Sequence, residues 1–470
     1  MRICDLFEES DSKKEVKDIK INSKKVERGD IFVCTSGVNF DRHDFIDEAV
    51  KNGASLIVVS KDIKRSDVEI IKVENTDKFL PVLARKLYDF HREDFKIVAV
   101  TGTDGKTTTA ETIYKLIGKD AGYLGTNGYK TSKHEGPLVN TTPDSDLLYK
   151  YFKLFKEDGV KIIVMEVSSE AMLRKRLEGL YFDVVILTNV TRDHLNVHKT
   201  LENYINCKKE VFSHLNKDGL SIINSDDSHY DEFKILNKNV ISYGLGGDYK
   251  LINYSLDKDY TKFTYSYKGK KEEVKSPLKA LFNIYNLMAA IACLDYLGYD
   301  YKKNLDKLKV EGRLEFINEG QGFTAIVDFA HTPNSIKNAL SYASSIKTHN
   351  LIVLTGQAGE RDEGKRPIIG KILEDFADKI ILTYDDPHRE DPKRTIDMIM
   401  SGMDNKEKVE VIIDRKKALE RLVDLAGPGD VIIALGKGSD SIHLAYPKNI
   451  HLSDIDEIKN NIKRKEAKNA

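Results

Sequence analysis

Several features that mark special classes of protein are scarce in this sequence of 470 residues. Its four cysteines are far apart and form no CxxC pair, so neither a disulfide framework nor a zinc site is expected. The N-terminus lacks the apolar core of a signal peptide, and no apolar run reaches the ~18 residues of a membrane span. We therefore expect a protein of the reducing cytoplasm that does not enter a membrane.

Charge of one sign is not in excess, since the formal net charge is −1. A chain with this balance has no global attraction to nucleic acid or to a membrane surface. Glutamine is rare, with only Gln321 and Gln357 beside abundant lysine and glutamate. Few glutamines among many charged residues is a pattern of hyperthermophile proteins, so the composition favours a thermophilic source.

The length predicts two to four domains, and three blocks emerge along the chain. Residues 1–93 combine short apolar runs with helical patterns and predict a small α/β module. Residues 94–312 alternate apolar strands with helices, as in a mostly parallel sheet covered on both faces, with a polar antiparallel piece near 249–275. Residues 313–470 repeat the alternation and predict a second, Rossmann-like doubly wound sheet.

A glycine-rich turn between a buried strand and a helix is the strongest local signal, at Val100–Thr108. Its glycines allow backbone N–H groups to approach phosphate, and the start of the helix favours negative charge. Lys106 would reach the terminal phosphates of ATP, and the Thr107 hydroxyl would bind Mg²⁺. The predicted ATP contacts in this loop are Gly102, Thr103, Asp104, Gly105, Lys106, Thr107 and Thr108.

Two further strands end in side chains suited to a metal. Glu166 closes the strand KIIVMEV, and His194 follows the strand FDVVILTNV within TNVTRDHL. Because parallel strands meet at the same edge of a sheet, both side chains are expected beside the phosphate loop. A carboxylate suits hard Mg²⁺, and the imidazole would serve a second metal.

These motifs resemble those of the Mur ligase and folylpolyglutamate synthetase superfamily. The general phosphate loop has four residues between its first glycine and the Gly-Lys pair, whereas Gly102 and Gly105 enclose only two, as in TGTxGKT. Asp104 stands where asparagine is usual. The segment ENYINCKKEVF is similar to the Mur ligase ENYxxAK, whose lysine is carbamylated and binds Mg²⁺. The resemblance thus implies two Mg²⁺ sites and a carbamylated Lys208, with Lys209 the rival.

The resemblance covers nearly the whole chain and is strongest to MurE-type ligases. It implies that a UDP-linked sugar-peptide contacts two residues of the first block and two loops of the second, although Asn22, Lys24 and Glu170 depart from the family pattern. These substrate residues are Ser23, His43, Asn140, Thr141, Thr142, Ser168, Ser169 and Arg176. It also implies that Asn283, Arg313 and Asp328 clasp the adenine and ribose end of ATP, while His331 shapes the loop.

The third block would hold the incoming amino acid, with Arg361 clamping its α-carboxylate. DDPH and GKGSD stand where diaminopimelate-adding relatives have DNPR and GKGHE, and the missing arginine argues against that substrate. Asp386 and Asp440 would instead suit the ammonium of lysine or a similar diamino acid. The remaining residues of the expected pocket are Asp385, His388 and Gly436.

The expected enzyme is an ATP-dependent acid–amino-acid ligase, a monomer acting on small molecules in the cytoplasm. It would convert the acceptor's carboxylate into an acyl phosphate with Lys106, Glu166, His194 and Lys208, and then join the amino acid to a UDP-linked cell-wall peptide. The glutamine deficit and the altered motifs slightly favour an archaeal pseudomurein peptide ligase. The alternatives are a bacterial MurE adding lysine or another diamino acid to UDP-MurNAc-L-Ala-D-Glu and, remotely, folylpolyglutamate synthetase.

Overall fold

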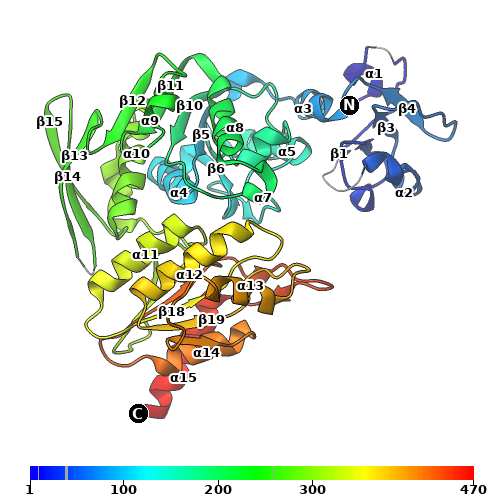
Figure 1. Ribbon diagram of the computed structural model, residues 1–470. Coiled ribbons are helices and arrows are strands. Elements are labelled where there is room, and N and C mark those ends of the chain that lie inside the picture. Colours follow the sequence, from blue (N-terminus) through cyan, green and yellow to red (C-terminus); the bar gives the residue numbers. More distant parts are fainter. Residues whose placement is uncertain (9, 37–40, 258, 470) are drawn as a thin grey trace. The chain divides into compact units, whose positions relative to one another are not determined.

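A computed structural model describes residues 1–8, 10–36, 41–257 and 259–469 of the chain (Figure 1). Its contacts form two compact units, which do not coincide with blocks of sequence. The first comprises Met1–Thr101, Ile117–Val185 and Cys207–Leu220, and the second comprises Gly102–Leu116, Ile186–Asn206 and Ser221–Ala470. The predicted α/β class is confirmed, while the three domain bounds given above stay a prediction.

The first unit begins with a four-stranded parallel sheet of order β1-β2-β3-β4. Alternate residues of its strands, such as Phe32 and Ile57, pack with Ile46 and Ala49 of a helix into one small core. The elements are α1 (Ile3–Leu6), β1 (Ile19–Lys20), β2 (Ile31–Val33), α2 (Ile46–Lys51), β3 (Leu56–Val59), β4 (Glu69–Lys72) and α3 (Thr76–Leu87).

The rest of the first unit is built on strands of order β10-β5-β9-β6-β7-β8, with β10 included as far as Val185. β5, β9 and β6 pair in parallel and are almost wholly buried, whereas β7 and β8 add antiparallel strands at the end. The elements are β5 (Lys96–Thr101), β6 (Ala121–Gly125), β7 (Gly128–Lys130), β8 (Glu135–Gly136), α5 (Ser145–Asp158), β9 (Ile162–Glu166), α6 (Ser169–Leu173) and β10 (Phe182–Leu187). The phosphate loop follows β5 directly along the chain, and Glu166 is the last residue of β9.

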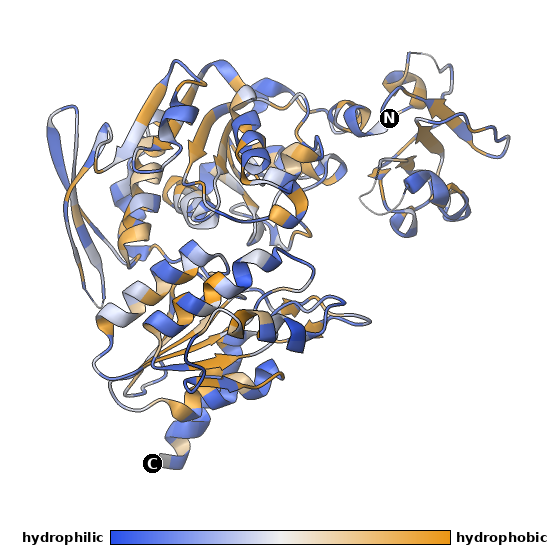
Figure 2. Cartoon of the chain, in the orientation of Figure 1, coloured by the Kyte–Doolittle hydropathy of each residue, from blue (hydrophilic) through white to orange (hydrophobic). Residues whose placement is uncertain are grey.

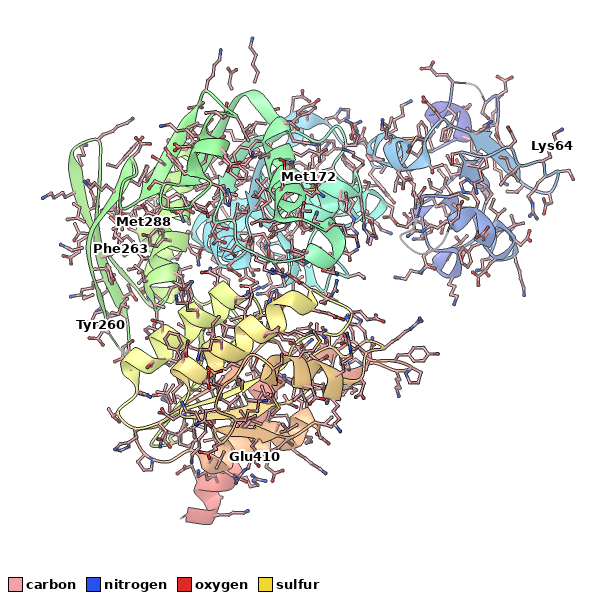
Figure 3. All side chains as sticks on the ribbon, viewed as in Figure 1. Lys64, Met172, Tyr260, Phe263, Met288 and Glu410 are labelled. Atoms are coloured by element: carbon pink, nitrogen blue, oxygen red, sulfur yellow. The ribbon has the colours of Figure 1, made fainter. Side chains whose placement is uncertain are left out.

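The second unit carries the helix α4 (Lys106–Ile117), apart from its last residue, and strands of order β15-β14-β13-β12-β11, of which β11 belongs to this unit only from Ser221 onward. The antiparallel piece predicted near 249–275 is confirmed as β13, β14 and β15. Figure 3 labels Phe263 of β14 and Met288 of α10, both buried. The elements of this stretch of chain are α7 (Leu195–His198), α8 (Leu201–Ser213), β11 (Leu215–Asn224), α9 (Tyr230–Lys234), β12 (Val240–Gly244), β13 (Tyr249–Leu256), β14 (Thr261–Tyr267), β15 (Lys270–Ser276) and α10 (Leu281–Leu297).

The second unit also holds a six-stranded sheet of order β16-β17-β21-β18-β19-β20, parallel except at β16. Helices α11 and α12 cover one face, and α14 and α15 cover the other (Figure 1). The elements are β16 (Glu315–Ile317), β17 (Thr324–Asp328), α11 (Pro333–Ile346), β18 (Leu351–Thr355), α12 (Arg366–Phe376), β19 (Lys379–Leu382), α13 (Pro392–Met400), β20 (Val409–Val411), α14 (Arg415–Leu425), β21 (Val431–Leu435), β22 (Ile442–His443), β23 (Ile450–His451) and α15 (Asp454–Asn469).

The strand β21 shows why this sheet is covered on both sides. Val431, Ile433 and Leu435 enter the core beneath α11 and α12, and the alternating Ile432 and Ala434 enter the core beneath α14 and α15. A strand buried on both faces has to be continuously apolar, and the central strands are accordingly hydrophobic in Figure 2. Among the described residues, no helix is long and apolar enough to cross a membrane.

Candidate active site

The phosphate loop has the backbone geometry that its glycines predict. Gly102 and Gly105 have φ values of +146° and +84°, and a Cβ at these positions would collide with side-chain oxygens of Thr188 and Asn286. Only glycine fits both conditions, a left-handed backbone and a close neighbour. The Lys106 ammonium donates to the carbonyls of Gly102 and Thr103 at 3.1 and 2.9 Å, so it lies over the loop.

The segment after β10 fastens this loop from one side. The Asn189 side chain accepts a hydrogen bond from the Asp104 N–H at 3.0 Å and donates to the Asp104 carbonyl at 3.1 Å. The Thr188 hydroxyl donates to the same carbonyl at 2.6 Å, and the Thr103 N–H donates to the Asn189 carbonyl at 2.8 Å. The backbone of Asp104 is therefore held on both its N–H and its C=O.

Two of the predicted ATP contacts lie beside the loop within the second unit. Arg313 donates to the Thr107 hydroxyl at 2.8 Å and stacks over the Phe329 ring at 4.3 Å from its centroid. Asp328 is buried, accepts from the N–H groups of Leu314 and Ala330 at 2.6 and 2.8 Å, and has its pKa raised by that burial. Arg313 thus contacts the phosphate loop, and Asp328 lies near enough to Arg313 to feel its charge.

Asn283, the third predicted ATP contact, makes mainly structural bonds. Its amide donates to the Lys279 carbonyl at 2.7 Å and its oxygen accepts from Asn286 at 3.0 Å. Asn286 is the residue that touches the phosphate loop, since its side chain lies against Gly105. Asn283 therefore reaches the loop through its neighbour on α10.

A cluster of charges surrounds His194, which adopts the left-handed conformation with φ +55°. Asp193 is buried, and its carboxylate lies 3.2 Å from the His194 ring, 3.2 Å from the Lys365 ammonium and 3.7 Å from the His331 ring. Burial lowers the pKa of His194 to about 4, and nearby cations, Lys106 among them, oppose the raising effect of Asp193. The imidazole is therefore neutral near pH 7 and retains a lone pair for a ligand.

In the first unit, Glu166 is fully buried at the end of β9. One carboxylate oxygen accepts from the Tyr123 hydroxyl at 2.6 Å and the Thr126 N–H at 2.9 Å. The other accepts from the Thr126 hydroxyl at 3.2 Å. These three hydrogen bonds hold the carboxylate in one orientation.

Lys208 is also deeply buried, with 1% of its surface exposed, whereas neighbouring Lys209 is partly exposed. An ammonium is costly to bury unless it is paired or chemically altered. Cys207, in place of the family's alanine, is half-buried, and burial raises the pKa of its thiol. The burial of position 208 agrees with a functional rather than a solvated lysine.

The TTPD loop and the segment after β9 meet within the first unit. Thr142 donates through its hydroxyl to the Glu166 carbonyl at 2.9 Å and accepts from the Ser168 N–H at 3.0 Å. Buried Arg176 donates to the Thr142 carbonyl at 3.0 Å and pairs with Asp144 at 2.6 Å. Of the other predicted acceptor residues, Ser169 is buried beside this junction, Thr141 lies 3.2 Å from the Thr126 hydroxyl, and Asn140 is partly exposed.

Asp146 lies two residues after this loop, and its buried carboxyl group should make the free energy of unfolding depend on pH. Burial and then the charge of Asp144 raise its pKa from 3.8 to about 7. The folded state thus binds the proton more tightly than the unfolded state, so stability falls as pH rises from about 4 to 7. In urea unfolding, Asp146→Asn should stabilise the protein by about 2–4 kcal/mol at pH 8 and by almost nothing at pH 4. An equal gain at both pH values would contradict this assignment.

The two predicted substrate residues of the small parallel sheet make local contacts. The Ser23 hydroxyl donates to Glu48 at 2.5 Å, and the His43 ring lies 2.5 Å from Asp41 and accepts from the Ser60 N–H at 3.1 Å. These bonds give both side chains a clear structural role. Their contact with a nucleotide stays a prediction.

The predicted amino-acid pocket centres on a lysine that sequence reasoning missed. Buried Lys437 donates to Asp386 at 2.8 Å, to Asp440 at 3.0 Å and to the Ile442 carbonyl at 2.8 Å. Although burial alone would lower the pKa of Lys437, these acidic neighbours and Asp385 raise it. The acidic pair expected to bind an ammonium from the substrate is therefore already joined to an internal ammonium.

Asp385 and His443 complete this cluster. Burial raises the pKa of Asp385 against the attraction of Arg415 and Lys437, and a ligand atom from each of Asp385, Asp386 and His443 lies within 4.8 Å of the others. Gly436, at the end of β21, lies against the Asp385 carboxylate. His443 was not predicted, since no motif marks it.

Arg361 and His388 lie on loops after β18 and β19. Arg361 is exposed, whereas nearby Arg366 is buried and pairs with Glu390 through two contacts of 2.7 and 2.8 Å. Burial first, and then the charge of Arg361, lowers the pKa of His388. His388 is therefore a neutral group, and the exposed Arg361 is the side chain available to a carboxylate.

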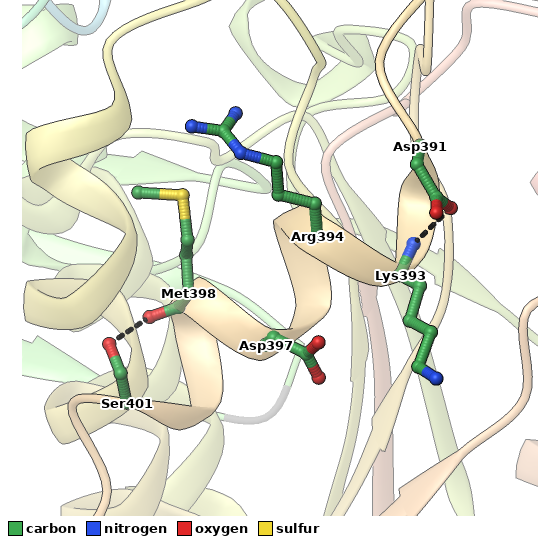
Figure 4. A pocket seen from close by; sticks show the side chains of 6 residues that line it. All are labelled: Asp391, Lys393, Arg394, Asp397, Met398 and Ser401. Atoms are coloured by element: carbon green, nitrogen blue, oxygen red, sulfur yellow. Dashed lines mark hydrogen bonds between the residues drawn. The ribbon is translucent and has the colours of Figure 1, made fainter.

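A separate hollow lies along α13 and is lined by Asp391, Lys393, Arg394, Asp397, Met398 and Ser401 (Figure 4). Asp391 caps the helix by accepting from the Lys393 N–H at 2.9 Å, and the Ser401 hydroxyl donates to the Met398 carbonyl at 2.7 Å. Because its lining comes from one helix and its cap and includes none of the predicted site residues, this hollow does not enter the site.

Comparison with protein families matches three successive models to the chain. The Mur ligase family catalytic domain matches residues 15–88, the Mur ligase middle domain 100–294, and the Mur ligase glutamate ligase domain 312–438. A protein of Aquifex aeolicus, named UDP-N-acetylmuramoyl-L-alanyl-D-glutamate--2,6-diaminopimelate ligase, is 37% identical over 91% of this chain and 89% of its own length. The chain belongs to the Mur ligase family. It is accordingly an ATP-dependent acid–amino-acid ligase, as predicted.

Other relatives of this Mur ligase agree. A Fusobacterium nucleatum protein of the same name is 36% identical over 95% of this chain and 94% of its own length. A solved structure named for the same diaminopimelate ligase has 25% identity and a TM-score of 0.65, and covers 99% of both chains. MurF of Thermotoga maritima, solved with ADP, has 22% identity and a TM-score of 0.68 over 97% of this chain and 99% of its own, and shows the shared fold.

These relatives bear on the choice between cell-wall types. The proteins from Aquifex and Fusobacterium are bacterial, and they favour the bacterial MurE alternative over the archaeal homologue that the sequence slightly favoured. Folylpolyglutamate synthase of Mycobacterium tuberculosis matches with a TM-score of 0.63 at 14% identity over 76% of this chain and 92% of its own, a likeness of fold alone.

Proposed function

We propose that this Mur ligase joins 2,6-diaminopimelate to UDP-N-acetylmuramoyl-L-alanyl-D-glutamate in a cytoplasmic step of peptidoglycan synthesis. The observation that carries the proposal is similarity along nearly the entire chain to relatives named for this reaction. The second unit supports it with a glycine-rich phosphate loop, Lys106 over that loop, and Arg313 beside it. The predicted amino-acid pocket contains both acidic and basic side chains. Such a pocket suits diaminopimelate, which carries both ammonium and carboxylate groups.

Mg²⁺ is part of the proposal, and the donors in each unit fit it. The second unit offers the Thr107 hydroxyl and the neutral imidazole of His194, and the first offers the Glu166 carboxylate and, once carbamylated, Lys208. The hydroxyl, carboxylate and carbamate oxygens are donors that Mg²⁺ prefers, and the imidazole nitrogen would complete the set. Bound Mg²⁺ would neutralise phosphate charge during transfer.

The residues of the chain would act mainly through position and charge. The acceptor's carboxylate attacks the γ-phosphorus of ATP, ADP leaves, and the Lys106 ammonium offsets the charge on the phosphates. The amine of the incoming amino acid then attacks the acyl carbon, the C–O bond to phosphate breaks, and the amine loses a proton. Arg361 would orient that amino acid by its α-carboxylate, as a bidentate donor.

Release of phosphate from ATP by the purified full chain tests the proposal. UDP-MurNAc-dipeptide and diaminopimelate together should stimulate release well above the rate with either alone, and mass spectrometry should find the tripeptide product. Lysine and other amino acids, and pseudomurein-type acceptors, form the comparison. If every pair fails to stimulate release, the ligase proposal is wrong for this chain.

Free lysine is a second candidate for the amino acid that is added, because His388 stands where the motif has arginine. Diaminopimelate carries a distal carboxylate, and relatives that add it have arginine in the motif where this chain has neutral His388. The pocket also has three acidic side chains, Asp385, Asp386 and Asp440, around Lys437. Because Lys437 already pairs with Asp386 and Asp440, the case for lysine rests on the neutral His388 rather than on these acidic side chains.

Replacing His388 with arginine should distinguish the two substrates. The new cation should raise kcat/KM for diaminopimelate by roughly 10-fold, as a charge-assisted pair with the distal carboxylate, and leave that for lysine unchanged or lower. Steady-state kinetics with both amino acids measures the ratio. Arg389→Lys, which retains the charge of the adjacent exposed residue, is the control. An unchanged ratio in His388→Arg would place the distal carboxylate elsewhere.

A further inference from the structure

The Asp104 side chain makes contacts that phosphate binding does not explain. Its carboxylate accepts from the Thr332 hydroxyl, at 3.0 Å on one oxygen and 3.2 Å on the other, and from the Asn334 amide at 3.1 Å. Thr332 is the N-cap of α11 and is fully buried, and Asn334 lies in the first turn of that helix. The middle of the phosphate loop is therefore tied to the start of α11.

The chemistry of this contact favours a carboxylate over the asparagine that is usual in the family. A carboxylate can accept from both partners on separate oxygens, whereas an asparagine side chain has one acceptor and one donor group. Negative charge is also favourable at the start of a helix. Because the backbone of Asp104 is itself held by Thr188 and Asn189, displacement of α11 would be transmitted to the loop.

The start of α11 is close to the proposed ATP-clasping residues. Thr332 follows the turn in which Asp328 is fixed by the N–H groups of Leu314 and Ala330. Arg313 contacts the phosphate loop through the Thr107 hydroxyl. The proposed Mg²⁺ would bind the same hydroxyl. The Asp104 contact involves no proposed nucleotide or metal ligand at its far end, so it can persist when ATP binds.

We propose that Asp104 is a positioning residue, which fastens the phosphate loop to α11 and so prealigns the phosphate-binding and ribose-binding sides of the ATP site. The inference rests on the proposed role of that site in binding ATP. Prealignment lowers the free energy needed to organise the site before ATP binds, and at saturation the bound nucleotide itself spans both sides. Asp104 therefore acts on ATP affinity more than on the chemical step.

The expected effect is specific to one substrate. Asp104→Ala should raise both the Kd and the KM for ATP by about 10-fold or more, as expected for loss of hydrogen bonds to a charged acceptor. The kcat should change less than threefold, and the KM for the amino acid should be unchanged. Asp391→Ala is the matched control, because Asp391 caps α13 ahead of a proline just as Thr332 caps α11.

An exchange of partners separates positioning from a general structural role. Asn334→Asp alone sets two carboxylates against each other and should weaken ATP binding at least as much as Asp104→Ala. In the double variant Asp104→Asn/Asn334→Asp, the amide introduced at position 104 donates to the carboxylate introduced at position 334, and its oxygen still accepts from Thr332. The ATP Kd should return to within about threefold of the original, since the charge-assisted contact is restored with its direction reversed.

Isothermal titration calorimetry with Mg²⁺–ATP alone gives the Kd values, and hydrogen exchange of residues 329–336 reports the start of α11. Lost protection in Asp104→Ala and its recovery in the double variant are expected. An ATP Kd within twofold of the original in Asp104→Ala, or a double variant no better than Asn334→Asp, would overturn the proposal. Because this titration needs no acceptor, failure of ligation in the phosphate-release assay would remove the proposed function without deciding the role of Asp104.

Discussion

Lys106→Ala is expected to lower ATP turnover by at least about 100-fold, which is the scale of losing one aligned electrostatic contact to a reacting group. The ammonium already lies over the loop, bonded to the carbonyls of Gly102 and Thr103. It has only to exchange these carbonyls for phosphate oxygens, where it offsets the charge that moves during phosphoryl transfer. Phosphate release at saturating acceptor and amino acid measures the loss.

Lys115→Ala supplies the matched control for this variant. Lys115 lies on the same helix, α4, and pairs with Glu111 at 2.7 Å rather than facing the loop. Because Glu111 is fully buried, loss of Lys115 should lower stability rather than the rate, so at a temperature where the variant is folded its ATP turnover should stay within about twofold. Calorimetry of ATP binding distinguishes loss of binding from loss of rate in Lys106→Ala. Unchanged turnover in Lys106→Ala would remove the phosphate loop from the mechanism.

Much of the fold could be predicted from local patterns. The apolar strands of β5, β9 and β10 and the alternation of polar and apolar residues in β13 and β14 fix their elements, because strand periodicity is a local property. The two-faced burial of β21 also follows from its unbroken apolar run. What local patterns could not show is that Gly102–Leu116 groups with the C-terminal half of the chain, since this depends on contacts between distant segments.

The residues of the candidate site likewise fall into two groups, those that a local motif predicts and those that depend on distant contacts. The phosphate loop is a local motif, so Gly102, Gly105 and Lys106 could be read directly. The partners that hold it could not, because Thr332 is separated from Asp104 by 228 positions and Lys365 from Asp193 by 172. Lys437 lay within a recognised motif, but its burial among three aspartates depends on the sheet order, which places only β18 between β19 and β21.

Amino-acid composition was the least reliable predictor of the cell-wall type to which the enzyme belongs. The scarcity of glutamine favoured an archaeal relative, whereas the relatives described above are bacterial. A compositional bias is an average over the whole chain and carries little information on the groups that contact a substrate. The altered DDPH and GKGSD motifs are different, since they place specific charges in the proposed pocket, and they retain a bearing on which amino acid is used.

Lys208→Ala should lower ligation by about 100-fold or more, because it would remove the proposed carbamate ligand of Mg²⁺, a contribution on the scale of several kcal/mol at the transition state. Lys208 is buried, with 1% of its surface exposed. In carbamylation the neutral amine attacks CO₂, the new N–C bond forms and a proton leaves, which replaces a cation by a carboxylate-like anion. Such an oxygen ligand is what Mg²⁺ prefers.

Labelling with CO₂ and its removal test directly whether Lys208 is carbamylated. Enzyme equilibrated with ¹³C-labelled bicarbonate should show a carbamate signal by NMR that is absent in Lys208→Ala, and removal of CO₂ should lower activity reversibly. Lys208→Arg should be as inactive as the alanine variant, because a guanidinium keeps its charge and does not form the carbamate under these conditions. Lys209→Ala is the control on the same helix, since Lys209 is less buried. Loss of both the carbamate signal and the activity in Lys209→Ala, with Lys208→Ala unaffected, would show that Lys209 carries the carbamate instead.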